Sequence, residues 1–183
     1  MYQLFPKEEW QKTLSDYTIR RYHIDNYGFP IITLEVANIL TEFLKDKSVV
    51  DLGCGSGYIS AVLSKLGVAD ITAVDNNERA WGKAYFDIVE EDMLEHDISS
   101  YDVVLLSWPD YCAPEAAKIA EKLTSGQILI FQGESRGGCT ADEDFFKLIN
   151  SDKFLEDELS IVLASYHARF WGIHDSWHVL VRR

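Results

Sequence analysis

Short apolar runs separated by polar turns dominate the chain and predict an α/β protein. Runs of this kind are typical of strands buried on both faces of a mostly parallel sheet. The strand-like runs are 49–52, 71–75, 86–90, 101–107, 128–132, 159–167 and 176–181. A helical stripe of apolar residues over 31–44 predicts a helix that packs on the sheet, and a further helix is expected over 142–150. The segment 76–85 is too short for more than a turn or two of helix.

The run 49–52 leads into the most informative stretch of the chain. Three alternating glycines, Gly53, Gly55 and Gly57, follow it, and apolar residues at helical spacing continue to Leu66. Glycines in such a turn permit positive φ angles and let a ligand approach the backbone, and the following helix offers unpaired N–H groups. The strand ends in Asp51, a carboxylate that would repel a pyrophosphate and attract a cation. We therefore expect a ligand site here, although an ordinary glycine turn is the alternative.

The acid followed by the glycine turn resembles the first motif of class I S-adenosylmethionine-dependent methyltransferases, acid-x-Gly-x-Gly-x-Gly. A dinucleotide fingerprint fits less well, because its third glycine position is Tyr58 here. The resemblance implies methyl transfer, S-adenosyl-L-methionine as cofactor, and a Rossmann-like, doubly wound α/β fold. Its sheet would be mostly parallel and seven-stranded, with an antiparallel last strand. The turn, including Cys54, would lie under the methionine and ribose parts, with Asp51 near the amino-acid end.

Two further acidic positions match the family. Asp75, followed by Asn76, ends the strand at 71–75, where a carboxylate can accept both ribose hydroxyls, although a helix-capping role is the alternative. Asp92 and Met93 stand where the family places an acid and an apolar side chain against adenine, with Glu91 or a solvated acidic loop as alternatives. The cofactor-binding set implied by the resemblance is Asp51, Gly53, Cys54, Gly55, Gly57, Asp75, Asn76, Asp92, Met93 and Ser107.

The methyl acceptor is expected beyond the strand at 101–107. Enzymes of this class that methylate nitrogen carry a polar residue, two prolines and an aromatic residue here, and this chain matches that pattern in part. Such a turn would orient the acceptor nitrogen toward the methyl group. In the same topology the connection before the last strand lies near the cofactor, and a histidine there is a suitable proton acceptor. The candidate catalytic residues are Ser107, Trp108, Pro109, Tyr111 and His174.

Two further segments contain candidate binding residues, and each also has a purely structural interpretation. Glu134 and Arg136 could bind substrate from the glycine-rich loop after 128–132, or this could be a plain loop in which Thr140 caps the next helix. The aromatic segment 1–30 is expected to form a lid or brace. Tyr22 or Tyr27 could contact the cofactor from it or fill the seam between lid and core.

Charge and composition bear on partners. Lys and Arg number 17 against 30 Asp and Glu, a formal net charge of -13, which disfavours nucleic acid as a substrate. We expect one cytoplasmic domain over residues 1–183, because no signal-like segment or run of 18 apolar residues occurs and three cysteines show no metal-ligand spacing. The preferred acceptor is a nitrogen or oxygen of a small molecule or protein. The alternatives are a catalytically silent binding subunit and a nucleic-acid N-methyltransferase. A looser resemblance to small methyltransferase-like proteins spans most of the chain and names no substrate.

Overall fold

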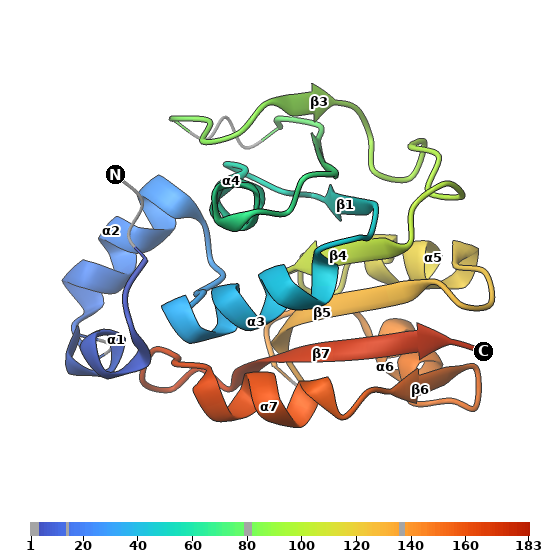
Figure 1. Cartoon of the computed structure of the whole chain (residues 1–183). Coiled ribbons are helices and arrows are strands. Elements are labelled where there is room, and N and C mark those ends of the chain that lie inside the picture. The colour runs from blue at the N-terminus through green and yellow to red at the C-terminus, as the bar shows by residue number, and fades with distance from the viewer. Residues whose placement is uncertain (1–3, 14, 79–81, 136–137) are drawn as a thin grey trace.

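The computed structural model describes residues 4–13, 15–78, 82–135 and 138–183, which form a seven-stranded sheet with helices on both faces (Figure 1). The strand order is β3-β2-β1-β4-β5-β7-β6. The strands are β1 Val49–Leu52, β2 Ile71–Asp75, β3 Ile88–Glu90, β4 Val103–Ser107, β5 Ile128–Glu134, β6 Phe154–Glu156 and β7 Asp175–Arg182. Strands β1 to β5 pair in parallel, and β7 runs antiparallel to β5 and β6. The predicted Rossmann-like sheet with an antiparallel last strand is confirmed.

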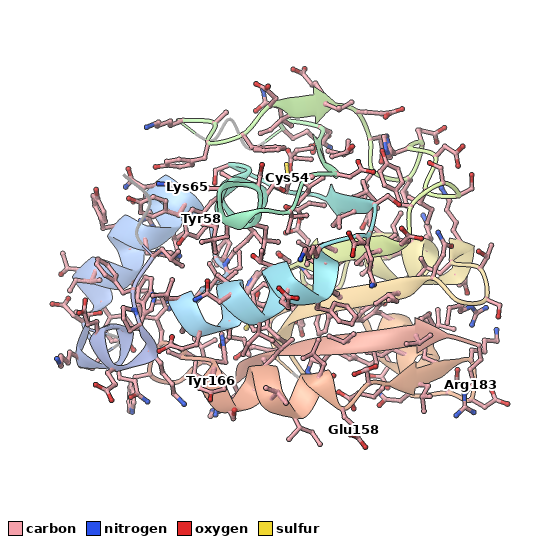
Figure 2. All side chains as sticks on the ribbon, in the orientation of Figure 1. Cys54, Tyr58, Lys65, Glu158, Tyr166 and Arg183 are labelled. Atoms are coloured by element: carbon pink, nitrogen blue, oxygen red, sulfur yellow. The ribbon has the colours of Figure 1, made fainter. Side chains whose placement is uncertain are left out.

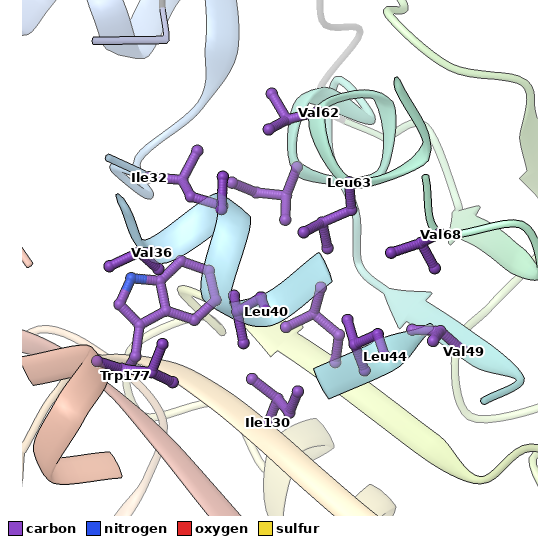
Figure 3. Close-up of a cluster of buried hydrophobic side chains, with 14 of the residues drawn as sticks. Ile32, Val36, Leu40, Leu44, Val49, Val62, Leu63, Val68, Ile130 and Trp177 are labelled. Carbon is purple, nitrogen blue, oxygen red and sulfur yellow. The ribbon is translucent and has the colours of Figure 1, made fainter. Parts of the chain in front are cut away.

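Helices cover the two faces of the sheet unevenly. They are α1 Lys7–Thr13, α2 Tyr17–Tyr27, α3 Leu34–Leu44, α4 Tyr58–Leu66, α5 Glu115–Lys122, α6 Glu143–Ile149 and α7 Leu159–Tyr166. Helix α3 contacts α4 and α7 on one face, whereas α5 and α6 contact each other on the other face. The first face is closed by an apolar cluster in which Val36 and Leu40 of α3 meet Trp177 of β7 (Figure 3). In the described parts of 76–87 and 91–102 there is no helix beside β3.

The expectation of a strand over 159–167 is wrong, because this segment forms α7. The Asp157 carboxylate accepts a hydrogen bond from the Leu159 N–H at 2.8 Å and satisfies the start of the helix. The helix buries Leu163 but exposes Ile161 by 74%, so it lacks the polar face that normally reveals a helix. The strand antiparallel to β7 at the sheet edge is instead β6, which the sequence pattern did not indicate.

Several element boundaries also differ from expectation. Helix α3 begins at Leu34 rather than near residue 31, because the Thr33 hydroxyl caps it by accepting from the Val36 N–H at 3.1 Å. Helix α6 is capped by Asp142, whose carboxylate accepts from the Phe145 N–H at 2.8 Å. The hydroxyl of Thr140 donates to the Glu134 carbonyl instead, so Thr140 is not the cap.

The N-terminal helices rest on the first face through aromatic contacts. Trp10 of α1 is buried and meets both His23 of α2 and Phe170 edge-on. His23 lies 3.0 Å from the Pro30 carbonyl, and burial lowers its pKa to about 4, so the ring is neutral near pH 7. The contact between His23 and the Pro30 carbonyl therefore ties α2 to the segment that follows it. None of the helices in the described ranges has both the length and the apolar character needed to cross a bilayer.

Candidate functional site

A cavity of about 390 Å³ opens at the carboxyl ends of β1, β2 and β4. This is the edge where ligands bind in open parallel sheets, and the volume falls within the usual range for small-ligand sites. The lining residues are Tyr27, Gly28, Phe29, Pro30, Leu52, Gly53, Cys54, Gly55, Ser56, Ile59, Asp75, Asn76, Glu78, Asp92, Met93, Leu106, Ser107, Trp108, Pro109, Asp110, Ala113, Glu115 and Ala116. One cavity thus joins the glycine turn to the segment after β4.

The glycine turn between β1 and α4 requires its glycines. Gly53, Gly55 and Gly57 have φ angles of 65°, 58° and 68°, a region that other residues adopt only with strain. A Cβ on Gly53 would lie 3.0 Å from the Met93 Cε, and one on Gly57 would lie 2.9 Å from the Phe86 Cβ. Cys54 and Tyr58 mark the turn and the start of α4 in Figure 2. Gly57 itself is not a lining residue, so its role is to shape the turn.

The Asp75 side chain is hydrogen-bonded to the same turn. One carboxylate oxygen accepts the Gly55 N–H at 2.8 Å and the other accepts the Asn77 N–H at 2.8 Å. Each oxygen keeps a further lone pair for a ligand donor. The carboxylate is therefore fixed at the wall of the cavity, where the ribose role was predicted.

Of the two acids proposed for the adenine position, only Asp92 lines the cavity, next to Met93. The Asp92 carboxylate accepts the Leu94 N–H at 2.8 Å. Glu91 instead lies 2.6 Å from His96 Nδ1. The arrangement favours Asp92 over Glu91.

Asp51 lies behind the turn rather than in the cavity wall. It is 1% exposed, one oxygen accepts the Ser60 hydroxyl at 2.6 Å, and the other has no hydrogen-bond partner in the described part of the chain. Burial raises the pKa of this carboxyl to about 7, with a smaller contribution from the charge of Asp75. Burial also raises the pKa of the neighbouring Cys54 thiol, so Cys54 enters the lining as a neutral group.

The segment after β4 forms the other end of the cavity. Ser107, Trp108 and Pro109 all line it, as predicted for the acceptor side. Trp108 has a φ of 56°, and its N–H donates to the Gln132 carbonyl at 2.6 Å. Its ring stacks on Phe29 with centroids 5.7 Å apart and planes at 11°. Phe29 and Trp108 therefore form a stacked aromatic pair at this end of the cavity, which we call the clamp.

Tyr111 and His174 are not brought into the cavity. Tyr111 is 65% exposed and does not line the cavity, although its neighbour Asp110 does. The backbone of His174 is held away from the cavity by Glu134, which accepts the His174 N–H at 2.8 Å and the Cys139 N–H at 2.7 Å. Glu134 thus connects the loops that contain Cys139 and His174. Arg136, the other residue predicted to bind substrate from this loop, lies outside the described residues.

Sequence reasoning missed Phe29 and Glu115 as lining residues. The break Gly28-Phe29-Pro30 was a usable signal for a segment that crosses the site, whereas nothing in the local sequence marked Glu115. The described lining carries the acids Asp75, Glu78, Asp92, Asp110 and Glu115 and includes no Lys, Arg or His. A cavity of this charge favours cationic ligands over phosphates.

Comparisons with known proteins show which proteins this chain is similar to. Residues 34–109 match the family described as methyltransferase small domain. A ribosomal protein L11 methyltransferase from Thermosipho melanesiensis is 27% identical over 165 residues, which cover 84% of this chain and 56% of that protein. A second L11 methyltransferase, from Thermotoga petrophila, is 33% identical over 72 residues, 39% of this chain and 24% of that protein.

Two solved structures show the same fold. A TehB-like SAM-dependent methyltransferase from Corynebacterium glutamicum has a TM-score of 0.55 and 17% identity, covering 94% of this chain and 99% of that one. A 1,6-didemethyltoxoflavin-N1-methyltransferase from Burkholderia thailandensis, with S-adenosylhomocysteine bound, has a TM-score of 0.50 and 19% identity, covering 96% and 90%.

The sheet order and the glycine turn at its carboxyl edge give the chain the fold of class I S-adenosylmethionine-dependent methyltransferases, the class of protein to which it is similar. Within that class, residues 34–109 are similar to the methyltransferase small domain, and the methyl donor of the family is S-adenosylmethionine. The chain spans just over half the length of the first curated relative that it matches.

Proposed function

We propose that the protein transfers the methyl group of S-adenosylmethionine to an amine nitrogen of a polypeptide. The observation that carries this proposal is the single cavity that joins the glycine turn and Asp75 to Ser107, Trp108 and Pro109. A donor and an acceptor can meet only if their subsites are continuous. The names of the curated relatives support a protein acceptor, and ribosomal protein L11 is the first candidate to test.

The residues present fit the cofactor. The glycine turn leaves space that a Cβ would fill, since a side chain on Gly53 would press on Met93, which also lines the cavity. Asp75 would hold the ribose hydroxyls and Asp92 the adenine amino group, with the turn at Gly53 and Gly55 under the methionine part. When bound, S-adenosylmethionine supplies an electrophilic methyl group on a sulfonium cation, which suits an acidic cavity.

The acceptor end favours an amine over a nucleic acid. Asp110 and Glu115 line the same cavity as the clamp of Phe29 and Trp108, and aromatic faces and carboxylates both attract ammonium groups. A nucleic-acid substrate would need basic groups at this opening, and the described lining residues offer none. At the acceptor itself, Ser107 and the turn at Trp108 would orient the nitrogen toward the methyl group.

The test has two arms. Calorimetry with S-adenosylmethionine and S-adenosylhomocysteine should show binding, which should be lost in Asp75→Ala and kept in Asp70→Ala, an acid outside the cavity lining. Labelled methyl transfer is then measured with ribosomal protein L11, free lysine and ribosomal RNA as separate acceptors. Label in the protein alone supports the proposal, and label only in RNA overturns it. Cofactor binding without transfer to any acceptor would favour the silent binding subunit.

A further inference from the structure

Residues 27–30 connect the two ends of the cavity, and we call this segment the strap. All four of its residues line the cavity. Helix α2 ends at Tyr27, and Gly28 follows with a φ of 107°, a backbone conformation that favours glycine. Tyr27 contacts the glycine turn and Phe29 contacts Trp108, so the strap can carry an effect from one end of the cavity to the other.

The first end of the strap is tied to the glycine turn by Ser56. The last carbonyls of a helix have no partner inside that helix, and the Tyr27 carbonyl is one of them. The Ser56 hydroxyl donates to this carbonyl at 2.7 Å, and Ser56 is 1% exposed. Because this hydrogen bond is buried, removal of the hydroxyl would leave the carbonyl without its donor. Ser56 therefore fixes the point at which the strap begins.

Ser56 also contacts a third segment, but through its main chain. The Ser56 carbonyl accepts the Tyr85 N–H at 2.8 Å. The Tyr85 ring stacks on the Tyr27 ring with centroids 5.2 Å apart and planes at 29°. A side-chain substitution at Ser56 leaves the main-chain contact with Tyr85 in place and removes the contact with Tyr27. Such a substitution therefore tests the anchor of the strap.

The second end of the strap carries one ring of the clamp. Phe29, two residues after Tyr27, stacks on Trp108 with centroids 5.7 Å apart. The next residue is held by His23, whose Nε2 lies 3.0 Å from the Pro30 carbonyl. Phe29 thus lies between two anchored main-chain carbonyls, those of Tyr27 and Pro30. The position of its ring depends on both anchors.

We propose that Ser56 is a positioning residue for the methyl acceptor: its hydroxyl holds the Tyr27 carbonyl and thereby places Phe29 in the clamp. Ser56 acts through the strap and does not itself contact the acceptor. Its hydroxyl has one proton, which the Tyr27 carbonyl accepts, so it has none to donate to the cofactor. The inference rests on the proposed function, because it concerns the acceptor of that reaction.

The kinetic consequence is a difference between the two substrates. Without its anchor at Tyr27, the strap no longer holds Phe29 against Trp108, and the acceptor loses part of the clamp. Ser56→Ala should therefore raise the KM for ribosomal protein L11 about twofold to tenfold in the methyl-transfer assay. The hydrogen bond from Gly55 to Asp75 remains, so calorimetry should show unchanged binding of S-adenosylhomocysteine.

A matched control separates positioning from stability. Ser160 of α7 is also buried, and its hydroxyl accepts the Val179 N–H of β7 at 2.8 Å, but it lies outside the cavity lining. Ser160→Ala should lower the unfolding temperature and leave the acceptor KM unchanged. An equal rise of the acceptor KM in Ser160→Ala and Ser56→Ala would overturn the proposal, because a general loss of stability would then explain both.

A double-mutant cycle connects Ser56 to the clamp. In protein that already carries Phe29→Ala, the change Ser56→Ala should have no further effect on the acceptor KM, because the ring that Ser56 places is absent. The proposal is overturned if the two single effects on the acceptor KM multiply. It is also overturned if Ser56→Ala weakens S-adenosylhomocysteine binding as much as it raises the acceptor KM, since Ser56 would then act on the cofactor.

A spectroscopic test needs no acceptor and separates this inference from the proposed function. In ¹⁹F spectra of protein labelled with fluorinated tryptophan, the Trp108 resonance is assigned by its loss in Trp108→Phe. Phe29→Ala should shift this resonance by removing the stacked ring, Ser56→Ala should shift it in the same direction, and Ser160→Ala should leave it in place. An unmoved Trp108 resonance in Ser56→Ala refutes the link to the clamp. If the resonance moves but none of the acceptors is methylated, the proposed function fails while the placement of Phe29 by Ser56 is retained.

Discussion

Replacing Asp51 by Asn should remove a large part of the pH dependence of stability. The Asp51 carboxyl is 1% exposed, and burial raises its pKa from 3.8 to about 7, against the opposing effect of the Ser60 hydrogen bond. The folded protein therefore keeps this carboxyl protonated at pH values where the unfolded chain has released the proton. Stability from this group is complete below about pH 4, falls as the pH rises, and reaches its minimum above about pH 7.

The size of the effect follows from the two pKa values. Each pKa unit corresponds to about 1.4 kcal/mol, so the change from 3.8 to about 7 corresponds to about 4 kcal/mol. This is a large part of the total stability of an ordinary domain. Asn has nearly the same shape as Asp, can still accept from Ser60 and does not titrate. The stability of Asp51→Asn relative to the native protein should therefore rise by about 4 kcal/mol between pH 4 and pH 8.

Urea denaturation followed by circular dichroism at a series of pH values measures this difference. Titrating groups that do not interact with Asp51 contribute equally to both proteins and cancel in the comparison. Ser60→Ala is a second variant: loss of its hydrogen bond to the carboxylate should raise the pKa of Asp51 further and extend the fall in stability above pH 7. Stability curves of the native protein and Asp51→Asn that stay parallel within about 1 kcal/mol would refute the reasoning.

Three further predictions concern the turn, the clamp and the loops. Gly57→Ala should lose about 1–3 kcal/mol of stability and the binding of S-adenosylmethionine, because Gly57 has a φ of 68° and a Cβ there would press on Phe86. Gly126→Ala is the control: its φ is 92°, but the space around it is open, so calorimetry should still show binding. Phe29→Ala should raise the acceptor KM about threefold to tenfold by removing the ring stacked on Trp108, and exposed Tyr111→Ala should not change it. Glu134→Gln should lose about 1–3 kcal/mol in thermal denaturation, because an amide cannot accept from both the Cys139 and His174 N–H groups.

The sequence predicted the sheet well where its strands are buried on both faces. Strands β1, β2 and β4 are runs of apolar residues, and their pairing in register follows from the parallel topology. It failed for α7, because Ile161 and Val162 face outward and remove the polar face on which helix prediction relies. It also missed β6, where only Phe154 of three residues is buried. The structure of each segment depends on the elements that pack against it, and its own sequence does not reveal those neighbours.

The two ends of the cavity also differ in how well the sequence predicts them. The cofactor end uses residues that directly follow β1, β2 and β3, so a strand-and-turn pattern was enough to predict Asp75 and Asp92 at one edge of the sheet. The acceptor end brings Phe29 onto Trp108 and Gln132 beside Ser107, contacts between segments that no local pattern connects.

The two ends of the cavity should also differ in how they tolerate substitutions. The glycine turn and Asp75 are tied together by the hydrogen bond from Gly55, so a change in one disturbs the other. Phe29 stacks on Trp108 and Gln132 donates to Asp175, and both residues come from segments separate from the glycine turn. Substitutions there can alter the methyl acceptor while cofactor binding stays intact. We therefore expect the choice of methyl acceptor to depend on Phe29 and Trp108 at the acceptor end rather than on the glycine motif that resembles other methyltransferases.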